Sequence, residues 1–246
     1  MQKEVFLMDR AHMDYAKLRV NFETKNTGNI MNIRSLNYIT IKIALCLSIF
    51  ITQANAEGLP KEFNIKEDDI VLGNVNSEVV LIEYYAPTCG PCANADRNIF
   101  PVIKEKYIDT GKIAYVMREF VGNKQDLDAS ILARCDGSTA KYIQFKSIIL
   151  SKQDDWAFGT DYRQRLESFA KLGGISKEQY ETCLNSDALV KTLIENTQIA
   201  ANLHNFIGTP SFFINGKLLD VRQVITANSL SYEIDKILQN GVKNDV

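Results

Sequence analysis

The stretch YYAPTCGPCANA, residues 84–95, places two cysteines two residues apart directly after an apolar segment. That segment, residues 79–86, shows no alternation of polar and apolar side chains, which is typical of a central strand covered on both faces. Pro91 suits the first turn of a helix, because the N–H that proline lacks would have no partner there. The stretch therefore predicts a buried strand that leads through a cysteine-containing turn into a helix.

The rest of the chain predicts an α/β fold that a helical segment interrupts. Strands are expected at residues 70–72 and 112–120, with a helix at 89–107 between them. Helical periodicity then predicts helices at 127–135, 138–151, 161–172, 176–184 and 187–204. Strands at 211–214 and 217–221 flank Asn215-Gly216, a strong hairpin signal, and a helix at 227–238 follows. We expect an α/β domain, residues 57–123 and 207–246, with an inserted helical domain, residues 124–206.

The N-terminal part has the pattern of an export signal. From Met31, the basic residues Arg34 and Lys42 precede an apolar run at 43–52 that is too short to span a bilayer comfortably. The run leads to Ala-Asn-Ala at 54–56, the small-x-small pattern that signal peptidase accepts. We expect residues 31–56 to be a signal peptide cleaved after Ala56, and residues 1–30 to be an upstream extension of the gene model. An uncleaved anchor or a buried helix is the alternative.

Composition indicates an ordinary globular protein, with 46% hydrophobic residues and a net charge of −2. Basic blocks interleaved with aromatic residues are missing, so nucleic-acid binding is not expected. The chain has five cysteines, and cleavage after Ala56 would remove Cys46. The remaining even number in an exported protein predicts two disulfides.

Cys89 and Cys92 have three possible roles: a metal clamp, a structural crosslink or a redox couple. A zinc site would need a second C-x-x-C or a histidine pair, but His204 is the one histidine after residue 56. A crosslink between cysteines this close restrains little chain entropy. We therefore favour the redox couple, and expect neither a metal nor another cofactor.

The position of Cys89 at the start of a helix favours its thiolate, because unpaired backbone N–H groups and the positive end of the helix dipole lie there. Cys92, one turn further, is expected to be buried. Disulfide exchange needs an accessible thiolate that attacks and a second thiol that releases the mixed disulfide. Cys89 is the expected nucleophile and Cys92 the resolving thiol, with Gly90 and Pro91 stiffening the turn between them.

Glu83 lies inside the apolar strand, six residues before Cys89. A charged side chain is costly in such a strand unless it has a use. The functional interpretation is a buried carboxylate below the disulfide that transfers a proton to or from Cys92. The alternative is a carboxylate at the end of the strand that reaches solvent.

EYYAPTCGPC at 83–92 and GTPSFFINGK at 208–217, with a helical segment between them, resemble the thioredoxin superfamily and in particular its DsbA-like branch. The resemblance covers about residues 65–240 and implies a thioredoxin fold with a helical insertion between the third strand and the cis-proline loop. It implies that Pro210 is cis and stands against the disulfide, where the backbone of Thr209 can pair with an extended substrate. Glu83 matches the buried acid of the family.

Two details bear on what the resemblance implies. The dipeptide Gly90-Pro91 is that of thioredoxin, whereas the strongly oxidising DsbA has Pro-His, so a weaker oxidant is expected. Gly90, Pro91, Thr209 and Pro210 are the expected substrate-binding residues.

Cys135 and Cys183 fall near the ends of two expected helices of the insertion. They are expected to form a structural disulfide, which would contribute about 4 kcal/mol in the chain-entropy model. A second redox couple is the alternative.

The resemblance implies a periplasmic thiol:disulfide oxidoreductase that introduces disulfides into unfolded or folding exported proteins that contain cysteines. A membrane partner resembling DsbB would reoxidise it. A monomer is expected, because no separate dimerisation segment precedes the catalytic domain. An exported reductase or isomerase, and a non-catalytic chaperone-like binding module, are the alternatives.

Overall fold

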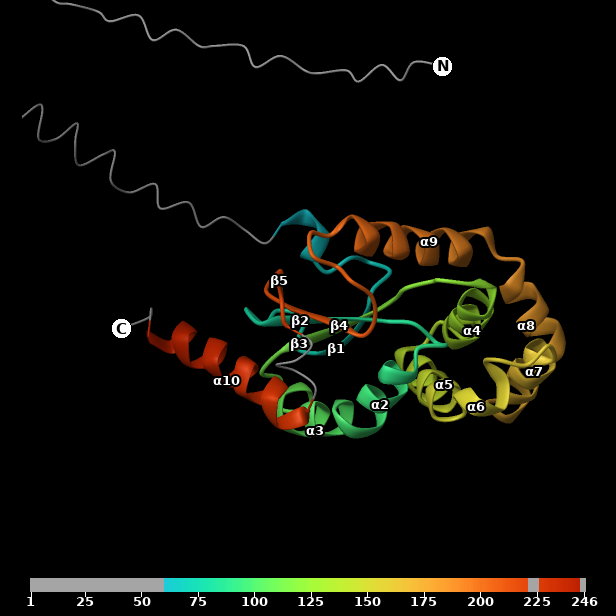
Figure 1. Ribbon diagram of the computed structural model, residues 1–246, viewed down its shortest axis with the longest axis horizontal. Coiled ribbons are helices and arrows are strands. Elements are labelled where there is room, and N and C mark those ends of the chain that lie inside the picture. Colours follow the sequence, from blue (N-terminus) through green and yellow to red (C-terminus); the bar gives the residue numbers. More distant parts are fainter. Residues whose placement is uncertain (1–59, 221–225, 244–246) are drawn as a thin grey trace, which may run out of the picture. The chain divides into compact units, whose positions relative to one another are not determined.

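The computed structural model describes residues 60–220 and 226–243. Their central feature is a five-stranded sheet in the order β1-β3-β2-β4-β5 (Figure 1). The strands are Ile70–Gly73 (β1), Val80–Tyr85 (β2), Ala114–Glu119 (β3), Ser211–Ile214 (β4) and Lys217–Leu218 (β5). β2 and β3 are parallel, and the other neighbouring pairs are antiparallel. The predicted α/β class is confirmed, and the predicted signal peptide lies outside the described residues.

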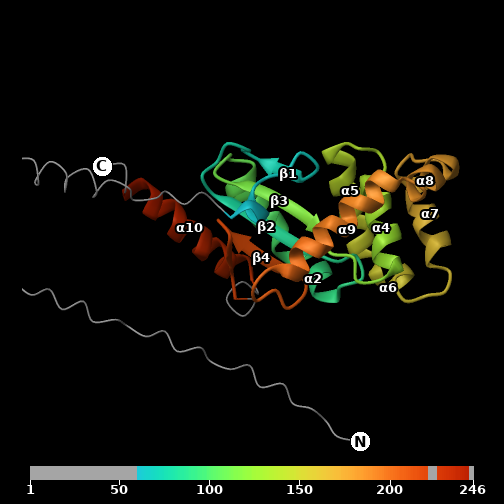
Figure 2. The same ribbon diagram turned by 90° about the horizontal axis from the view of Figure 1, so that it is seen from above.

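β2 is buried along its whole length, as its apolar sequence predicts. Leu81 and Tyr85 face one layer of the core, and Ile82 and Tyr84 face the other. Helices α2 (Gly90–Asn98), α3 (Phe100–Ile103) and α10 (Ala227–Lys243) cover the first face. Helix α9 (Asp187–Asn202) and the short helix η1 (Lys61–Phe63) lie on the second (Figures 1 and 2).

The insertion consists of helices, most of which lie at one end of the sheet, while α9 runs back over its second face (Figures 1 and 2). They are α4 (Lys124–Arg134), α5 (Thr139–Ser151), α6 (Gln153–Trp156), α7 (Tyr162–Leu172), α8 (Lys177–Leu184) and α9. Polar caps begin several of them, including Asn123 for α4 and a Ser176–Gln179 capping box for α8. Five of the helices form close to their predicted bounds. Helix α6 was not predicted, because four residues are too few to show periodicity.

Three predicted elements were wrong in extent. The final helix, predicted at 227–238, continues to Lys243. The helix expected at 89–107 is interrupted at Ile99, and a π-helical turn, η2 (Lys104–Ile108), follows α3. Pro101 explains the interruption, because it has no N–H to continue the helical hydrogen bonds. The second strand of the hairpin ends at Leu218, so the expected strand to residue 221 is shorter than predicted.

A buried ion pair joins the insertion to the sheet. Arg134 of α4 donates two hydrogen bonds of 2.7 Å to the carboxylate of Glu119, the last residue of β3. Tyr142 of α5 donates a third, at 2.8 Å, to the same carboxylate. Bidentate pairing of this kind fixes geometry as well as charge. The insertion is therefore held firmly at the end of the sheet from which α2 and its cysteines project.

Candidate active site

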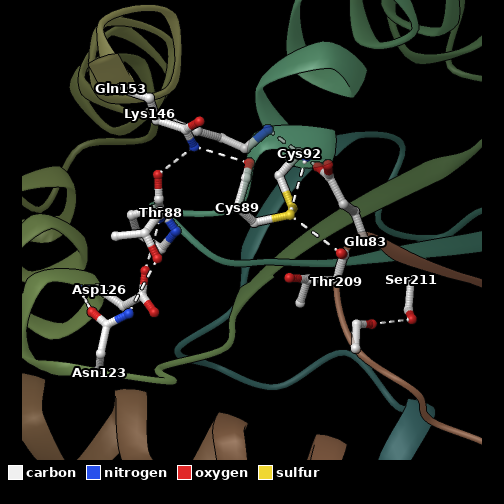
Figure 3. The surroundings of a disulfide bond; sticks show 12 residues. Glu83, Thr88, Cys89, Cys92, Asn123, Asp126, Lys146, Gln153, Thr209 and Ser211 are labelled. Atoms are coloured by element: carbon white, nitrogen blue, oxygen red, sulfur yellow. Dashed lines mark hydrogen bonds and ion pairs between the residues drawn. A yellow bond between two sulfur atoms is a disulfide. The ribbon is translucent and has the colours of Figure 1, made fainter. Parts of the chain in front are cut away.

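Cys89 and Cys92 form a disulfide at the N-terminus of α2 (Figure 3). Cys89 is the N-cap residue, and the backbone N–H of Cys92 donates to its Sγ at 3.2 Å. Cys92 is 0% exposed, whereas Cys89 is partly exposed, and Gly90 and Pro91 lie at the surface. An attacking thiolate can therefore reach Cys89 but not Cys92.

The loop before β4 faces the disulfide from the other side. The Thr209–Pro210 peptide bond is cis, and the carbonyl oxygen of Thr209 lies 3.2 Å from Cys89 Sγ (Figure 3). Ser211, which begins β4, donates its hydroxyl to the carbonyl of Gly208. The sequence motifs at 83–92 and 208–217, distant in the chain, thus meet at the exposed sulfur.

The insertion supports the turn that carries Cys89. Gln153 of α6 donates through Nε2 to the carbonyl oxygens of Pro87, at 2.6 Å, and Cys89, at 2.9 Å. The turn is also held by Asp126 of α4, whose Oδ1 accepts a hydrogen bond from the backbone N–H of Thr88 at 2.8 Å (Figure 3). Sequence reasoning missed both residues, because neither stands in a motif.

Burial raises the pKa of the Asp126 carboxyl, and backbone N–H donors from Thr88 and Gly122 oppose that shift. The second carboxylate oxygen of Asp126 accepts the Gly122 N–H at 3.1 Å. Asp126 therefore joins the cysteine turn to the loop after β3, and its burial makes it the most pH-sensitive of these contacts.

Glu83 is buried in the middle of the sheet, with 1% of its surface exposed, so the alternative that it reaches solvent was wrong. It pairs in register with Met117 of β3 and Phe212 of β4. Its Oε2 accepts the Tyr115 hydroxyl at 2.9 Å and the Lys146 ammonium at 3.2 Å. Burial raises the pKa of Tyr115 well above its usual value, and the Glu83 charge raises it further, so that phenol stays a donor.

Lys146 of α5 is the cation beneath the active site, and sequence reasoning missed it. Its Nζ also contacts a second carboxylate, that of Asp96 in α2, at 2.9 Å. Burial disfavours the charged ammonium, but the carboxylates of Glu83 and Asp96 outweigh burial and raise the pKa of Lys146. A lysine in the amphipathic pattern of a predicted helix gives no signal that it will be buried.

Cys135 and Cys183 form a second disulfide, 5.6 Å between Cα atoms, between the C-terminal ends of α4 and α8. It lies within the insertion and bridges 48 positions of the chain. In the described residues, no group of three or more histidines, cysteines, aspartates or glutamates is arranged to hold a metal ion.

A disulfide at a helix N-terminus that faces a cis-proline loop, on a sheet of this topology, defines a thioredoxin-fold protein. A family model described as Thioredoxin matches residues 66–236, so the chain belongs to this family. Curated relatives narrow the class. A Rickettsia typhi protein named as a protein-disulfide oxidoreductase is 50% identical over 182 residues, which cover 74% of this chain and 66% of that protein. A similarly named Rickettsia felis protein is 49% identical over 193 residues, 76% of this chain and 67% of that protein.

Solved structures agree with this placement. The crystal structure of Wolbachia pipientis alpha-DsbA1 has a TM-score of 0.66 and 26% identity, covering 74% of this chain and 96% of that one. Oxidised BdbD from Bacillus subtilis, at 19% identity and a TM-score of 0.63, shares the fold. The chain is a DsbA-like member of the thioredoxin superfamily, and it spans about two thirds of the length of the rickettsial relatives it matches.

Proposed function

We propose that this protein is an exported thiol:disulfide oxidoreductase that introduces disulfides into other proteins through Cys89 and Cys92. The observation that carries the proposal is the asymmetry of the disulfide: one sulfur partly exposed at a helix N-terminus, the other buried. An N–H donor at Cys89 Sγ and the helix dipole favour negative charge on that sulfur. Cys89 is therefore the better leaving group and, when reduced, the better nucleophile.

The exchange proceeds in two steps. A substrate thiolate attacks Cys89 Sγ, the bond between Cys89 and Cys92 breaks, and a mixed disulfide joins substrate and Cys89. Cys92 leaves as a thiolate and takes up one proton. A second substrate thiolate then attacks the substrate sulfur of the mixed disulfide, and Cys89 leaves as a thiolate. Two electrons have then passed from the substrate dithiol to the cysteine pair.

Substrate binding would use the backbone around the exposed sulfur. Thr209 and Pro210 form one wall of the site, and Gly90 and Pro91 lie at its rim. An extended segment lying along Thr209 would bring its own cysteine to Cys89 and pair through main-chain groups. Recognition of this kind is independent of side-chain sequence, which suits a protein that oxidises many unfolded or folding exported chains.

The location and partners are proposed on the same basis. The signal-like pattern at 31–56 supports export to the periplasm, with cleavage after Ala56, and disulfide formation suits an oxidising compartment. A membrane partner resembling DsbB would restore the disulfide, and the protein would act as a monomer. None of the helices in the described residues is long and apolar enough to cross a membrane.

The reduction potential tests the proposal. The purified protein is equilibrated in glutathione buffers, and the fluorescence of Trp156, the single tryptophan, reports the state of the pair. Trp156 lies in the same short helix as Gln153, which contacts the Cys89 carbonyl, so its surroundings depend on the active-site turn. A value at or a few tens of millivolts below that of DsbA, about −120 mV, supports a disulfide donor.

A value near that of thioredoxin, about −270 mV, would instead identify an exported reductant. If Cys89 and Cys92 show no redox change, the enzyme proposal fails and a binding module remains. The Gly90-Pro91 dipeptide brings no imidazole donor to the thiolate, so we expect a potential below that of DsbA.

A further inference from the structure

A pocket of about 210 Å³ lies beside the active-site turn, between α2 and the neighbouring ends of α5 and α6. It is smaller than the ~300–1,000 Å³ of typical small-molecule sites, so it suits a single side chain. We propose that this α2–α6 pocket receives the carboxamide of an Asn or Gln side chain from the substrate segment that carries the attacking cysteine. The inference rests on the proposed function and adds a side-chain preference to its main-chain recognition.

The pocket is built from residues of both the thioredoxin-fold domain and the insertion. Its buried lining residues are Ala93, Leu150 and Gln153. Its exposed lining residues are Gly90, Asn94, Arg97, Ser151 and Asp154. Gln153 and Thr209 contact Cys89 from opposite sides (Figure 3). The pocket therefore adjoins the reactive turn on the side away from the cis-proline loop.

The wall formed by α2 offers hydrogen-bond donors. Its lining residues recur at a spacing of three and four positions, which places them on one face of the helix. The Oδ1 of Asn94 accepts a hydrogen bond from Asn98 at 2.7 Å, and its Nδ2 donates none within residues 60–220 and 226–243. Arg97 likewise makes no hydrogen bond or ion pair within those residues. An amide N–H and a guanidinium are therefore available on this wall.

The wall formed by the insertion offers acceptors. Both hydrogen bonds of Gln153 run from its Nε2 to carbonyl oxygens, those of Pro87 and Cys89, so the nitrogen of the amide must face them. Its Oε1 accepts no hydrogen bond from the described part of the chain, although the residue is only 6% exposed, and this oxygen keeps access to solvent. The carboxylate of the next residue, Asp154, is exposed and forms no ion pair among the described residues.

The two walls together select an uncharged group that both donates and accepts. A basic side chain in the pocket would meet the like charge of Arg97, and an acidic one would meet that of Asp154. An apolar side chain would take the polar groups of the walls out of water without giving them partners, which is unfavourable. A carboxamide can accept through its oxygen from the α2 wall and donate through its nitrogen to the insertion wall.

The position of the pocket predicts which substrate residue reaches it. In an extended segment, residues two positions apart point to the same side and are ~7 Å apart along the chain. Gly90, at the rim of the pocket, directly follows Cys89, and a Cβ atom there would have no heavy atom within 4 Å beyond its chain neighbours in the described residues. The surface between Cys89 and the pocket is open, so we expect the carboxamide two positions from the substrate cysteine.

The test is a competition between reduced peptides for the oxidised full chain. Each peptide carries two cysteines, so that exchange ends in a peptide disulfide and a reduced Cys89–Cys92 pair. The peptides differ at one residue, two positions before or two positions after a cysteine, which is Gln, Leu, Lys or Glu. Mass spectrometry of the early products gives ratios of kcat/KM. The same ratios measured with oxidised glutathione correct for the intrinsic reactivity of each peptide.

For the unmodified protein, the Gln peptide should be preferred to the Leu peptide by about threefold to tenfold, as expected for one or two neutral hydrogen bonds. The ratio of Lys to Glu peptide should lie within about twofold of one. Each of these charged side chains meets one attractive and one repulsive wall.

Two charge reversals should convert this preference. Arg97→Glu places acidic groups on both walls and should raise the ratio of Lys to Glu peptide at least about tenfold, whereas Asp154→Lys should lower it by a similar factor. Both positions are exposed, so the fold tolerates the changes. Asp155→Lys is the matched control: it makes the same change of charge at the next residue of α6, which pairs with Lys152 and does not line the pocket. It should leave both ratios unchanged.

A ratio of Gln to Leu peptide near one at both test positions would overturn the proposal. So would charge reversals that leave the ratio of Lys to Glu peptide where it was, or an equal response to Asp155→Lys, which would mean that only the general surface charge matters. If the unmodified protein oxidises none of the peptides, the proposed exchange activity itself fails, so the two failures are distinguishable.

Discussion

The Cys89–Cys92 disulfide lies at the N-terminus of a helix, whereas the Cys135–Cys183 disulfide joins the C-terminal ends of two helices. Cys89 caps the N-terminus of α2, and its sulfur receives the N–H of Cys92 at 3.2 Å. Cys135 caps the C-terminus of α4, and Cys183 lies in the last turn of α8. Their sulfurs lie 3.7 and 3.6 Å from the carbonyl oxygens of Gln179 and Cys135.

This difference teaches why one crosslink suits exchange and the other suits stability. A helix N-terminus carries partial positive charge that stabilises a thiolate, and a C-terminus carries partial negative charge that opposes it. Exchange needs a thiolate both as the attacking and as the leaving group. We therefore infer that the Cys135–Cys183 disulfide is structural, although both of its cysteines are partly exposed.

The largest effect is expected at the first disulfide. Cys89→Ser should abolish oxidation of a reduced, unfolded test protein, because no nucleophilic sulfur remains at the surface. Cys92→Ser should instead accumulate mixed disulfides at Cys89, since the resolving thiol is absent. Non-reducing electrophoresis with mass spectrometry distinguishes the two. Retained activity in Cys89→Ser would favour the chaperone-like binding module.

Removing the Cys135–Cys183 disulfide should lower the stability of the protein and leave its exchange activity nearly unchanged. The double variant Cys135→Ala/Cys183→Ala should lose up to about 4 kcal/mol of the free energy of unfolding, the chain-entropy value for a loop of this length. Its exchange rate in mild conditions should stay within about twofold of the unmodified protein. Urea unfolding and the oxidation assay measure the two quantities. A large change of rate without a change of stability would identify a second redox couple.

The features of the active site that depend on neighbouring residues could be predicted from the sequence. An unbroken apolar strand, a C-x-x-C motif with proline between its cysteines, and Asn-Gly in a hairpin are signals carried by neighbouring residues. The resemblance to the thioredoxin superfamily implied that Thr209 and Pro210 would face the cysteines. The close approach of the Thr209 carbonyl to Cys89 Sγ agrees with it.

The contacts that hold the active-site strand and turn in place could not be predicted from patterns of neighbouring residues. Lys146 and Glu83 are 63 positions apart, Gln153 and Cys89 are 64, and Asp126 and Thr88 are 38. Each donor or acceptor belongs to a helix of the insertion whose docking depends on the tertiary structure. The sequence of one chain specifies such contacts only through the complete fold.

Gln153→Ala tests how far the insertion controls the reactive disulfide. Loss of the hydrogen bonds to the carbonyls of Pro87 and Cys89 should lower the free energy of unfolding by about 1–2 kcal/mol. The looser turn should also slow exchange about threefold to tenfold, whereas the structural disulfide should be unaffected. Gln164→Ala, at an exposed position of α7, is the control. Equal rates for both variants would show that the turn holds its geometry without α6.

The smallest effect on the free energy of unfolding is expected for Asp126→Asn, and the size of this effect depends on pH. Burial raises the pKa of Asp126 above its unfolded value of about 3.9, so its contribution to stability is complete below about pH 4 and declines as pH rises through the folded pKa. Asparagine does not titrate. The free energy of unfolding of the variant, minus that of the unmodified protein, should therefore increase between about pH 3 and pH 7.

Urea unfolding at several pH values measures this difference, and exposed Asp154→Asn should leave it constant. A difference that falls with pH would mean that the N–H donors of Thr88 and Gly122 outweigh burial at Asp126. The turn before Cys89 would then be held more tightly as the carboxylate ionises. The reactive disulfide would gain support from the insertion under the neutral conditions that also favour its thiolate, and the structural disulfide would not.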